Sequence, residues 1–151
     1  MTRIWERLYL GSLADAEQLS RSNPVNIDVV VSLCEEAVSQ QRPGLVYKHI
    51  PIAASGPIPA ARFRVIMATI GKSVRIQRVL VHCFAGMSRS PILVAAWLDR
   101  CGYAQLNRGI KEISEVREID PCPELLSSIE AHLRADDGLS HPMQQRRDSD
   151  Y

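Results

Sequence analysis

One short stretch of the chain places a cysteine and an arginine at a spacing suited to phosphate chemistry. Cys83 and Arg89 lie six positions apart, between the apolar run 79–81 and the apolar segment 91–98. This pattern predicts a strand, a tight turn and then a helix. The N-terminus of a helix presents unpaired backbone N–H groups and about half a positive charge, so an anion binds well there. The stretch therefore predicts a phosphate cradle with a nucleophile at its base.

The side chains of this turn fit a phosphatase that forms a phosphocysteine intermediate. The field of the helix favours the thiolate of Cys83, which is a competent nucleophile toward phosphorus. The planar guanidinium of Arg89 can hold two phosphate oxygens. The hydroxyl of Ser90 can donate a hydrogen bond to the sulfur and help it leave when water attacks. The backbone amides expected to hold the phosphoryl group belong to Phe84, Ala85, Gly86, Met87, Ser88 and Arg89.

The sequence H-C-F-A-G-M-S-R-S at positions 82–90 resembles the signature loop of the cysteine-dependent protein tyrosine phosphatase superfamily, in the form typical of dual-specificity phosphatases. The resemblance covers residues 4–135 and implies that His82 hydrogen-bonds the cradle rather than titrating in catalysis. It implies a phosphorylated protein or another phosphate monoester as substrate, with no metal and no cofactor. Three further segments are similar to strands of that family: 8–12, 29–34 and 47–52.

The chain departs from the family at the position of the general acid. In the family an Asp follows the strand that leads to this loop and protonates the leaving oxygen, whereas Ala54 occupies that position here. Asp and Glu are absent from the whole stretch 37–98. General acid catalysis contributes about 10²–10⁴-fold. Its loss is expected to slow alkyl phosphates most, because their leaving oxygens are the most basic.

Three explanations fit Ala54. It is an engineered substitution that slows turnover and leaves binding intact, or it is natural, or another group supplies the proton. A natural Ala54 suits a slow enzyme or a phosphate-binding module that recognises a phosphorylated partner without hydrolysing it. For the third explanation, the resemblance places Glu118 and Asp120 beside the cradle, so Asp120 is a candidate substitute acid. The simpler interpretation of both is an ordinary solvated acid.

Cys34 ends a predicted strand at a position that resembles the partner cysteine in the lipid phosphatase and regenerating-liver branches of the superfamily. In those branches the partner forms a reversible disulfide with the nucleophile and protects it from over-oxidation. The resemblance therefore implies a redox partner for Cys83. An inert buried cysteine is the alternative.

The pattern of segments predicts an α/β fold with a mainly parallel central sheet of four to five strands, flanked by helices on both faces in three layers. Ligands of such sheets bind beyond the carboxyl ends of the strands. We expect a catalytic domain at 1–135 and a disordered polar tail at 136–151. Predicted strands at 27–33, 46–52 and 79–82 alternate with predicted helices at 12–21, 58–73, 89–102, 106–117 and 123–135.

Composition and charge indicate an ordinary globular domain of 151 residues with a net charge of +1. No signal peptide and no apolar run of about 18 residues is present, and four scattered cysteines suit a reducing compartment. We therefore expect a cytoplasmic protein without a membrane or nucleic-acid partner. The net charge hides an asymmetry, because the segment 37–98 holds eight Lys or Arg and no acid. This asymmetry predicts a positive field that steers phosphorylated ligands to the cradle.

Overall fold

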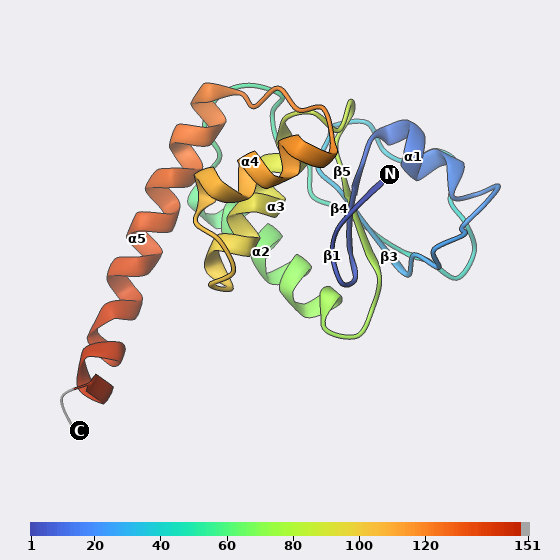
Figure 1. Ribbon diagram of the computed structural model, residues 1–151. Coiled ribbons are helices and arrows are strands. Elements are labelled where there is room, and N and C mark those ends of the chain that lie inside the picture. The colour runs from blue at the N-terminus through green and yellow to red at the C-terminus, as the bar shows by residue number, and fades with distance from the viewer. Residues whose placement is uncertain (149–151) are drawn as a thin grey trace.

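A five-stranded sheet forms the centre of the molecule (Figure 1). The computed structural model describes the backbone of residues 1–148 and the side chains of residues 1–137. The strand order is β1-β2-β5-β3-β4; β1 pairs with β2 antiparallel, and the other neighbours are parallel. The predicted mainly parallel α/β fold is thus confirmed. Its elements are β1 (Thr2–Trp5), β2 (Leu8–Gly11), α1 (Leu13–Gln18), β3 (Val29–Ser32), β4 (Val46–His49), α2 (Ala60–Val74), β5 (Val79–His82), α3 (Arg89–Arg100), α4 (Leu106–Val116) and α5 (Pro123–Asp148).

Helices cover the two faces of the sheet unequally. In β5, Val79 and Val81 point to one face and Leu80 to the other, as the two-residue period of a strand requires. The Leu80 face packs under α1, whereas the opposite face packs against α2, α3 and α5 in the larger core cluster. Figure 1 shows this division, with α1 apart from the other helices. The central strands are buried on both faces, so they consist of continuous apolar runs.

The start of α1 follows the local sequence closely. The Ser12 hydroxyl accepts from the Asp15 amide, and the Asp15 carboxylate accepts from the Ser12 amide. This capping box satisfies two of the orphan donors of the first turn. A helix beginning at this serine is therefore confirmed.

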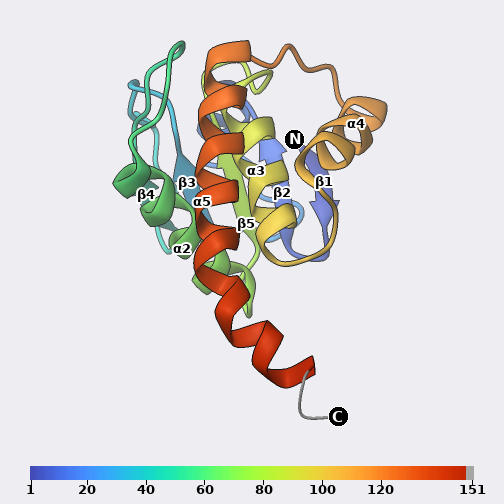
Figure 2. The same ribbon diagram turned by 90° about the vertical axis from the view of Figure 1, so that its left-hand side faces the viewer.

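The last helix differs from the sequence prediction. α5 continues to Asp148, through much of the segment 136–151 that the sequence predicts to be disordered. Residues 149–151 lie outside the described part of the chain. Figure 2 shows the end of α5 extending beyond the rest of the molecule. A helix that is already docked propagates by adding one hydrogen bond per residue, so its extension needs no apolar periodicity.

Within residues 1–148, no helix has both the length and the apolar character needed to cross a membrane.

Candidate active site

The loop from Cys83 to Ser88, here the Cys83 loop, connects β5 to α3 at the carboxyl edge of the sheet. The reactive side chains are all covered: Cys83 is 2% exposed, Ser90 0% and Arg89 8%. The sulfur of Cys83 lies 3.2 Å from the hydroxyl oxygen of Ser90. The structure thus brings together a thiol, a hydroxyl and a guanidinium at the N-terminus of a long helix, where an anion is favoured.

Gly86 forms the tight part of this loop. Its φ is +72°, in the left-handed region that glycine adopts without cost. A Cβ at this position would lie 2.7 Å from the carbonyl oxygen of Gly11 and would collide with the guanidinium of Arg117. Both the backbone angle and the close approach of β2 therefore require glycine.

Arg117, which follows α4, holds the Cys83 loop from outside. Its Nε donates to the carbonyl oxygen of Gly86 at 3.0 Å, and its Nη1 donates to the hydroxyl of Thr2 at 3.3 Å. The guanidinium thereby links the loop to the edge strand β1. The sequence analysis missed this residue, because a single arginine far along the chain carries no spacing signal.

His82 supports the loop from below. The ring is fully buried, and its Nδ1 lies 3.1 Å from the carbonyl oxygen of Cys83. A carbonyl only accepts, so Nδ1 carries the proton and Nε2 accepts from the Ser32 hydroxyl at 2.6 Å. Burial lowers the pKa of His82 and keeps the ring neutral. This arrangement fits a supporting histidine.

Three backbone contacts tie the Cys83 loop to its surroundings. The Leu13 amide donates to the carbonyl oxygen of Phe84 at 2.9 Å. The Asp120 amide donates to the carbonyl oxygen of Met87 at 2.7 Å. The Cys122 amide donates to the Ser88 hydroxyl at 2.9 Å. The loop is therefore held by α1 on one flank and by the segment between α4 and α5 on the other.

The segment 52–58, here the Ala54 loop, lies next to the Cys83 loop. Nη1 of Arg89 donates to the carbonyl oxygen of Ile52 at 3.2 Å, which joins the two loops. The side chains of Ala53, Ala54 and Ser55 are exposed, and they offer methyl groups and a hydroxyl but no carboxyl group. The predicted acid position therefore lies beside the loop without an acid of its own.

The two acids considered as substitutes, Asp120 and Glu118, lie in the segment that follows α4. The backbone of Asp120 contacts Met87, so the residue is beside the Cys83 loop, and its side chain is exposed. The side chain of Glu118 is also exposed. In the described part of the chain, neither carboxylate makes a hydrogen bond or an ion pair with the Ala54 loop.

Cys34 lies two residues beyond the end of the pairing between β3 and β5, in which Ser32 stands opposite His82. Its side chain is fully buried, and its thiol donates to the carbonyl oxygen of Glu36 at 3.4 Å. Burial, followed by the negative charge of Glu36, raises the pKa of the Cys34 thiol. Cys34 and Cys83 follow the adjacent strands β3 and β5, two residues and one residue beyond their ends, and both are free thiols.

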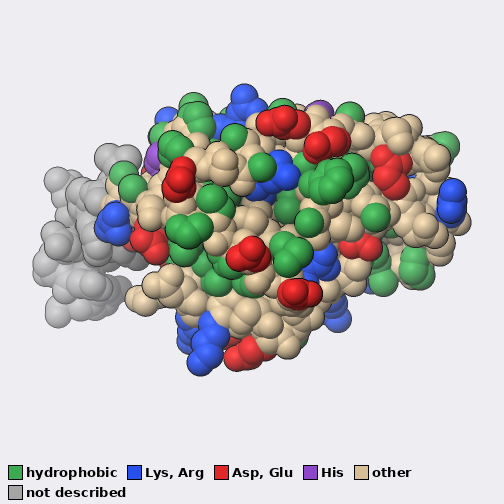
Figure 3. Space-filling view, turned by 90° about the horizontal axis from the view of Figure 1, so that it is seen from above, with side chains coloured by type: hydrophobic (Ala, Val, Ile, Leu, Met, Phe, Trp, Pro, Cys, Tyr) green, Lys and Arg blue, Asp and Glu red, His purple; other side chains and the backbone are tan. Residues whose placement is uncertain are grey.

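The face of the molecule at the carboxyl ends of the parallel strands carries side chains of both charges. The carboxyl ends of the parallel strands point upward in Figure 1, and Figure 3 views that face. Among the side chains coloured there, Asp and Glu are interspersed with Lys and Arg. The segment 37–98 has no Asp or Glu, so the acids on this face come from other segments, and this face is not uniformly basic.

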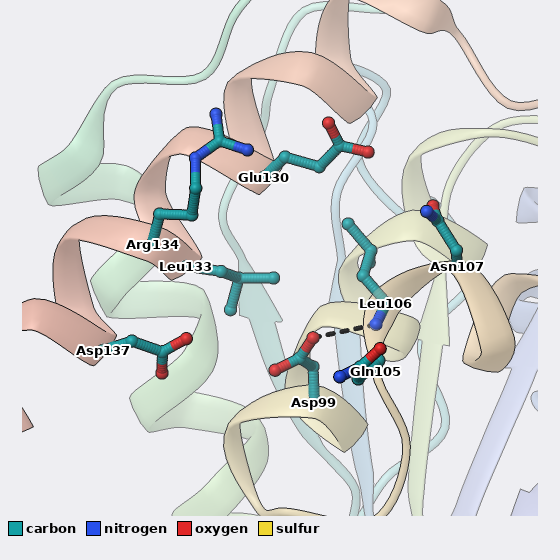
Figure 4. A pocket seen from close by; sticks show the side chains of 8 residues that line it. All are labelled: Asp99, Gln105, Leu106, Asn107, Glu130, Leu133, Arg134 and Asp137. Atoms are coloured by element: carbon teal, nitrogen blue, oxygen red, sulfur yellow. Dashed lines mark hydrogen bonds between the residues drawn. The ribbon is translucent and has the colours of Figure 1, made fainter.

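Away from the Cys83 loop, a hollow lies between α5 and the segment that joins α3 to α4 (Figure 4). It contains no residue of the Cys83 loop. Among the described residues, no cluster of His, Cys, Asp or Glu could hold a metal ion. The hollow is lined by Asp99, Gln105, Leu106, Asn107, Glu130, Leu133, Arg134 and Asp137.

A buried thiol at a strand-to-helix turn, with a guanidinium and a hydroxyl beside it on a mainly parallel sheet, defines the class of cysteine-dependent phosphatases. The family model for the dual specificity phosphatase catalytic domain matches residues 8–133 of the chain. The chain therefore belongs to the dual specificity phosphatase family.

Known relatives agree with this assignment. Human dual specificity protein phosphatase 15 is 30% identical over 76% of this chain and 40% of its own length. The tyrosine-protein phosphatase yvh1 of Schizosaccharomyces pombe is 25% identical over 97% of this chain and 46% of its own length. The chain thus spans less than half of each of these relatives. The crystal structure of human DUSP28 has a TM-score of 0.79 at 23% identity, covering 92% of this chain and 99% of that one, and shows the likeness of fold.

Proposed function

We propose that the chain hydrolyses phosphate monoesters through a phosphocysteine intermediate, on proteins that carry phosphotyrosine, phosphoserine or phosphothreonine. The Cys83 thiolate attacks phosphorus, while Arg89 and the loop amides hold the phosphoryl oxygens. The hydroxyl of Ser90 donates to the sulfur when water displaces it. No step requires a metal or a cofactor.

The observation that carries this proposal is the buried contact of 3.2 Å between the sulfur of Cys83 and the hydroxyl of Ser90. A hydroxyl at that distance stabilises a thiolate better than a thiol, both before attack and after release. A protein that only recognised phosphate would need the amides and Arg89, but neither the thiol nor this hydroxyl.

The exposed Ala54 supports a slow enzyme. With no carboxyl group at this position, hydrolysis of phosphoserine and phosphothreonine depends on a proton from elsewhere. Aryl phosphates with acidic leaving groups need this proton less. We therefore infer a preference for aryl over alkyl phosphates.

Ala54 also favours a second candidate function, a phosphate-binding module that recognises a phosphorylated partner with little or no hydrolysis. The two candidates make different predictions for the same protein. The enzyme turns over an activated phosphate ester, whereas the binding module holds the ester unchanged. A cytoplasmic location remains a prediction from the sequence for both.

We further propose that Cys34 protects the nucleophile during oxidation. Peroxide would convert the Cys83 thiolate to a sulfenic acid, and the Cys34 thiol would then displace water to form a disulfide, so that the two thiols are oxidised and peroxide is reduced to water. The adjacency of β3 and β5 supports this pairing. Excess peroxide should lower the protein mass by two hydrogens in the wild type, and dithiothreitol should restore its activity. In Cys34→Ser it should oxidise Cys83 further to the sulfinic acid, which dithiothreitol does not reduce.

Release of nitrophenol from para-nitrophenyl phosphate tests the proposed function. The leaving group barely needs an acid, so this substrate reports on the nucleophile and the Cys83 loop. We expect turnover by the wild type and none by Cys83→Ser, which should still bind inorganic phosphate. Absence of turnover in the folded, reduced wild type would favour the phosphate-binding module.

A further inference from the structure

The first turns of α5 hold the Ala54 loop in place. The Ile58 amide donates to the Ser128 hydroxyl at 3.0 Å, and Nε2 of His132 donates to the Ile58 carbonyl oxygen at 2.6 Å. Ser128 and His132 are four residues apart, so they lie on one face of the helix. That face of α5 is therefore directed at the Ala54 loop, which runs beside the start of the helix (Figure 1).

Glu124 lies one turn before Ser128 on the same face. A Cβ on Gly56 would be 3.8 Å from a carboxylate oxygen of Glu124, so this carboxylate reaches the Ala54 loop two positions from Ala54. The Glu124 side chain is exposed. Its carboxylate is therefore open to solvent and free of packing against the core.

Cys122 connects the three parts of this arrangement. Its amide donates to the hydroxyl of Ser88 in the Cys83 loop. Hydrogen bonds from the backbone amides of Leu125, Gly56 and Glu124 lower the pKa of its thiol. The start of α5 is thus fixed between the Cys83 loop and the Ala54 loop, and Glu124 is fixed with it.

We propose that Glu124 donates the proton to the leaving oxygen, the role that an Asp at position 54 has in the family; this rests on the proposed phosphocysteine function. As the Cys83 sulfur bonds to phosphorus, the bond between phosphorus and the leaving oxygen breaks. That oxygen keeps the electron pair and takes the proton of the Glu124 carboxyl group, leaving a carboxylate. In the second half the carboxylate takes a proton from the attacking water, and inorganic phosphate and the Cys83 thiolate are released.

The contacts favour Glu124 over the other two acids. Asp120 is anchored by its amide to the carbonyl oxygen of Met87, on the outer flank of the Cys83 loop. The carboxylate of Glu124 instead lies beside the loop that carries the acid in the family, 3.8 Å from where a Cβ on Gly56 would be. General acid catalysis requires the donor on the leaving-group side of phosphorus, within hydrogen-bond reach of that oxygen.

The test compares Glu124→Gln with the wild type on phenyl phosphate and para-nitrophenyl phosphate. We expect kcat/KM to fall about 10²-fold on phenyl phosphate, and much less on para-nitrophenyl phosphate. Glu130→Gln is the matched control, because it makes the same change on the same helix but faces the hollow of Figure 4. We expect it to leave both rates unchanged. Ala54→Asp in the Glu124→Gln background should restore the rate on phenyl phosphate.

The role of Glu124 would be overturned if Glu124→Gln lost no kcat/KM, or lost it equally on both substrates. It would also be overturned if Glu130→Gln showed the same loss. The phosphocysteine mechanism would stand in each case. If Asp120→Asn lost kcat/KM on phenyl phosphate alone, and Glu124→Gln lost none, the proton donor would be Asp120. A wild type without turnover of para-nitrophenyl phosphate would instead overturn the proposed function itself.

Discussion

The Cys83 loop and the Ala54 loop lie side by side, but they are built differently. In the Cys83 loop the reactive side chains are buried, and contacts with α1, Arg117 and Cys122 hold the backbone from several sides. In the Ala54 loop the side chains at 53–55 are exposed, and the backbone is held mainly at its two ends, by Arg89 and by α5. Phosphate binding and nucleophilic attack are therefore encoded in one short stretch, whereas proton donation depends on a neighbouring helix.

Arg89→Lys should have the largest effect, because Arg89 serves both loops. Lysine keeps the charge but loses the planar fork that can hold two phosphate oxygens, and it cannot maintain the same bond to Ile52. We expect kcat on para-nitrophenyl phosphate to fall by about 10²–10³-fold. Arg100→Lys, at the far end of α3, is the control and should behave as the wild type. A mild loss in Arg89→Lys would show that charge alone is sufficient.

Ala54→Asp sharpens the comparison by adding an acid to the Ala54 loop. We expect turnover of phosphoserine peptides to rise by no more than about tenfold in the wild type, because Glu124 already supplies the proton. The gain on para-nitrophenyl phosphate should be small. The gain on the phosphoserine peptides should be larger when Ala54→Asp is combined with Glu124→Gln. Equal gains on both substrates would mean that position 54 is not the vacant acid position.

Ser90→Ala tests the release step in the Cys83 loop. Removing a hydrogen bond to a charged sulfur should slow hydrolysis of the phosphocysteine by about tenfold. A burst of nitrophenol, equal to the enzyme concentration, should then precede the steady state. Ser114→Ala, on the exposed surface of α4, is the control. A slower burst in Ser90→Ala, with no change in the steady state, would place the hydroxyl in the attack step instead.

The smallest expected effect concerns His82 beneath the Cys83 loop. Burial lowers its pKa from the ordinary value of 6.5, so below that pH the unfolded chain takes up a proton that the folded protein does not. The free energy of unfolding should therefore decrease as the pH falls from about 6.5 toward the folded-state pKa. Urea midpoints should decrease less over this range in His82→Asn than in the wild type. Equal decreases of the urea midpoint in the two proteins would show that folding does not lower the pKa of His82.

The sequence predicts well the features that depend on neighbouring residues. β5 ends at His82 as expected, because the apolar run and the turn that follows it are contiguous. The capping box of Ser12 and Asp15 is likewise local, and it places the start of α1.

Features that depend on distant pairing were missed. β1 is a short edge strand whose formation requires β2, so the residues of Thr2–Trp5 carry little signal of their own. Arg117 and Glu124 reach the two loops only because α4 and α5 fold back onto the carboxyl edge of the sheet. For the same reason the face in Figure 3 is not uniformly basic, because acids from segments outside 37–98 lie on it.

The most direct test of the phosphocysteine mechanism is to stop the reaction with acid during turnover of para-nitrophenyl phosphate and determine the intact mass and peptide masses. We predict one added phosphoryl group, on the peptide that contains Cys83, and more of it in Ser90→Ala. Turnover with no phosphoryl group on Cys83, or with the group on another residue, would contradict the mechanism.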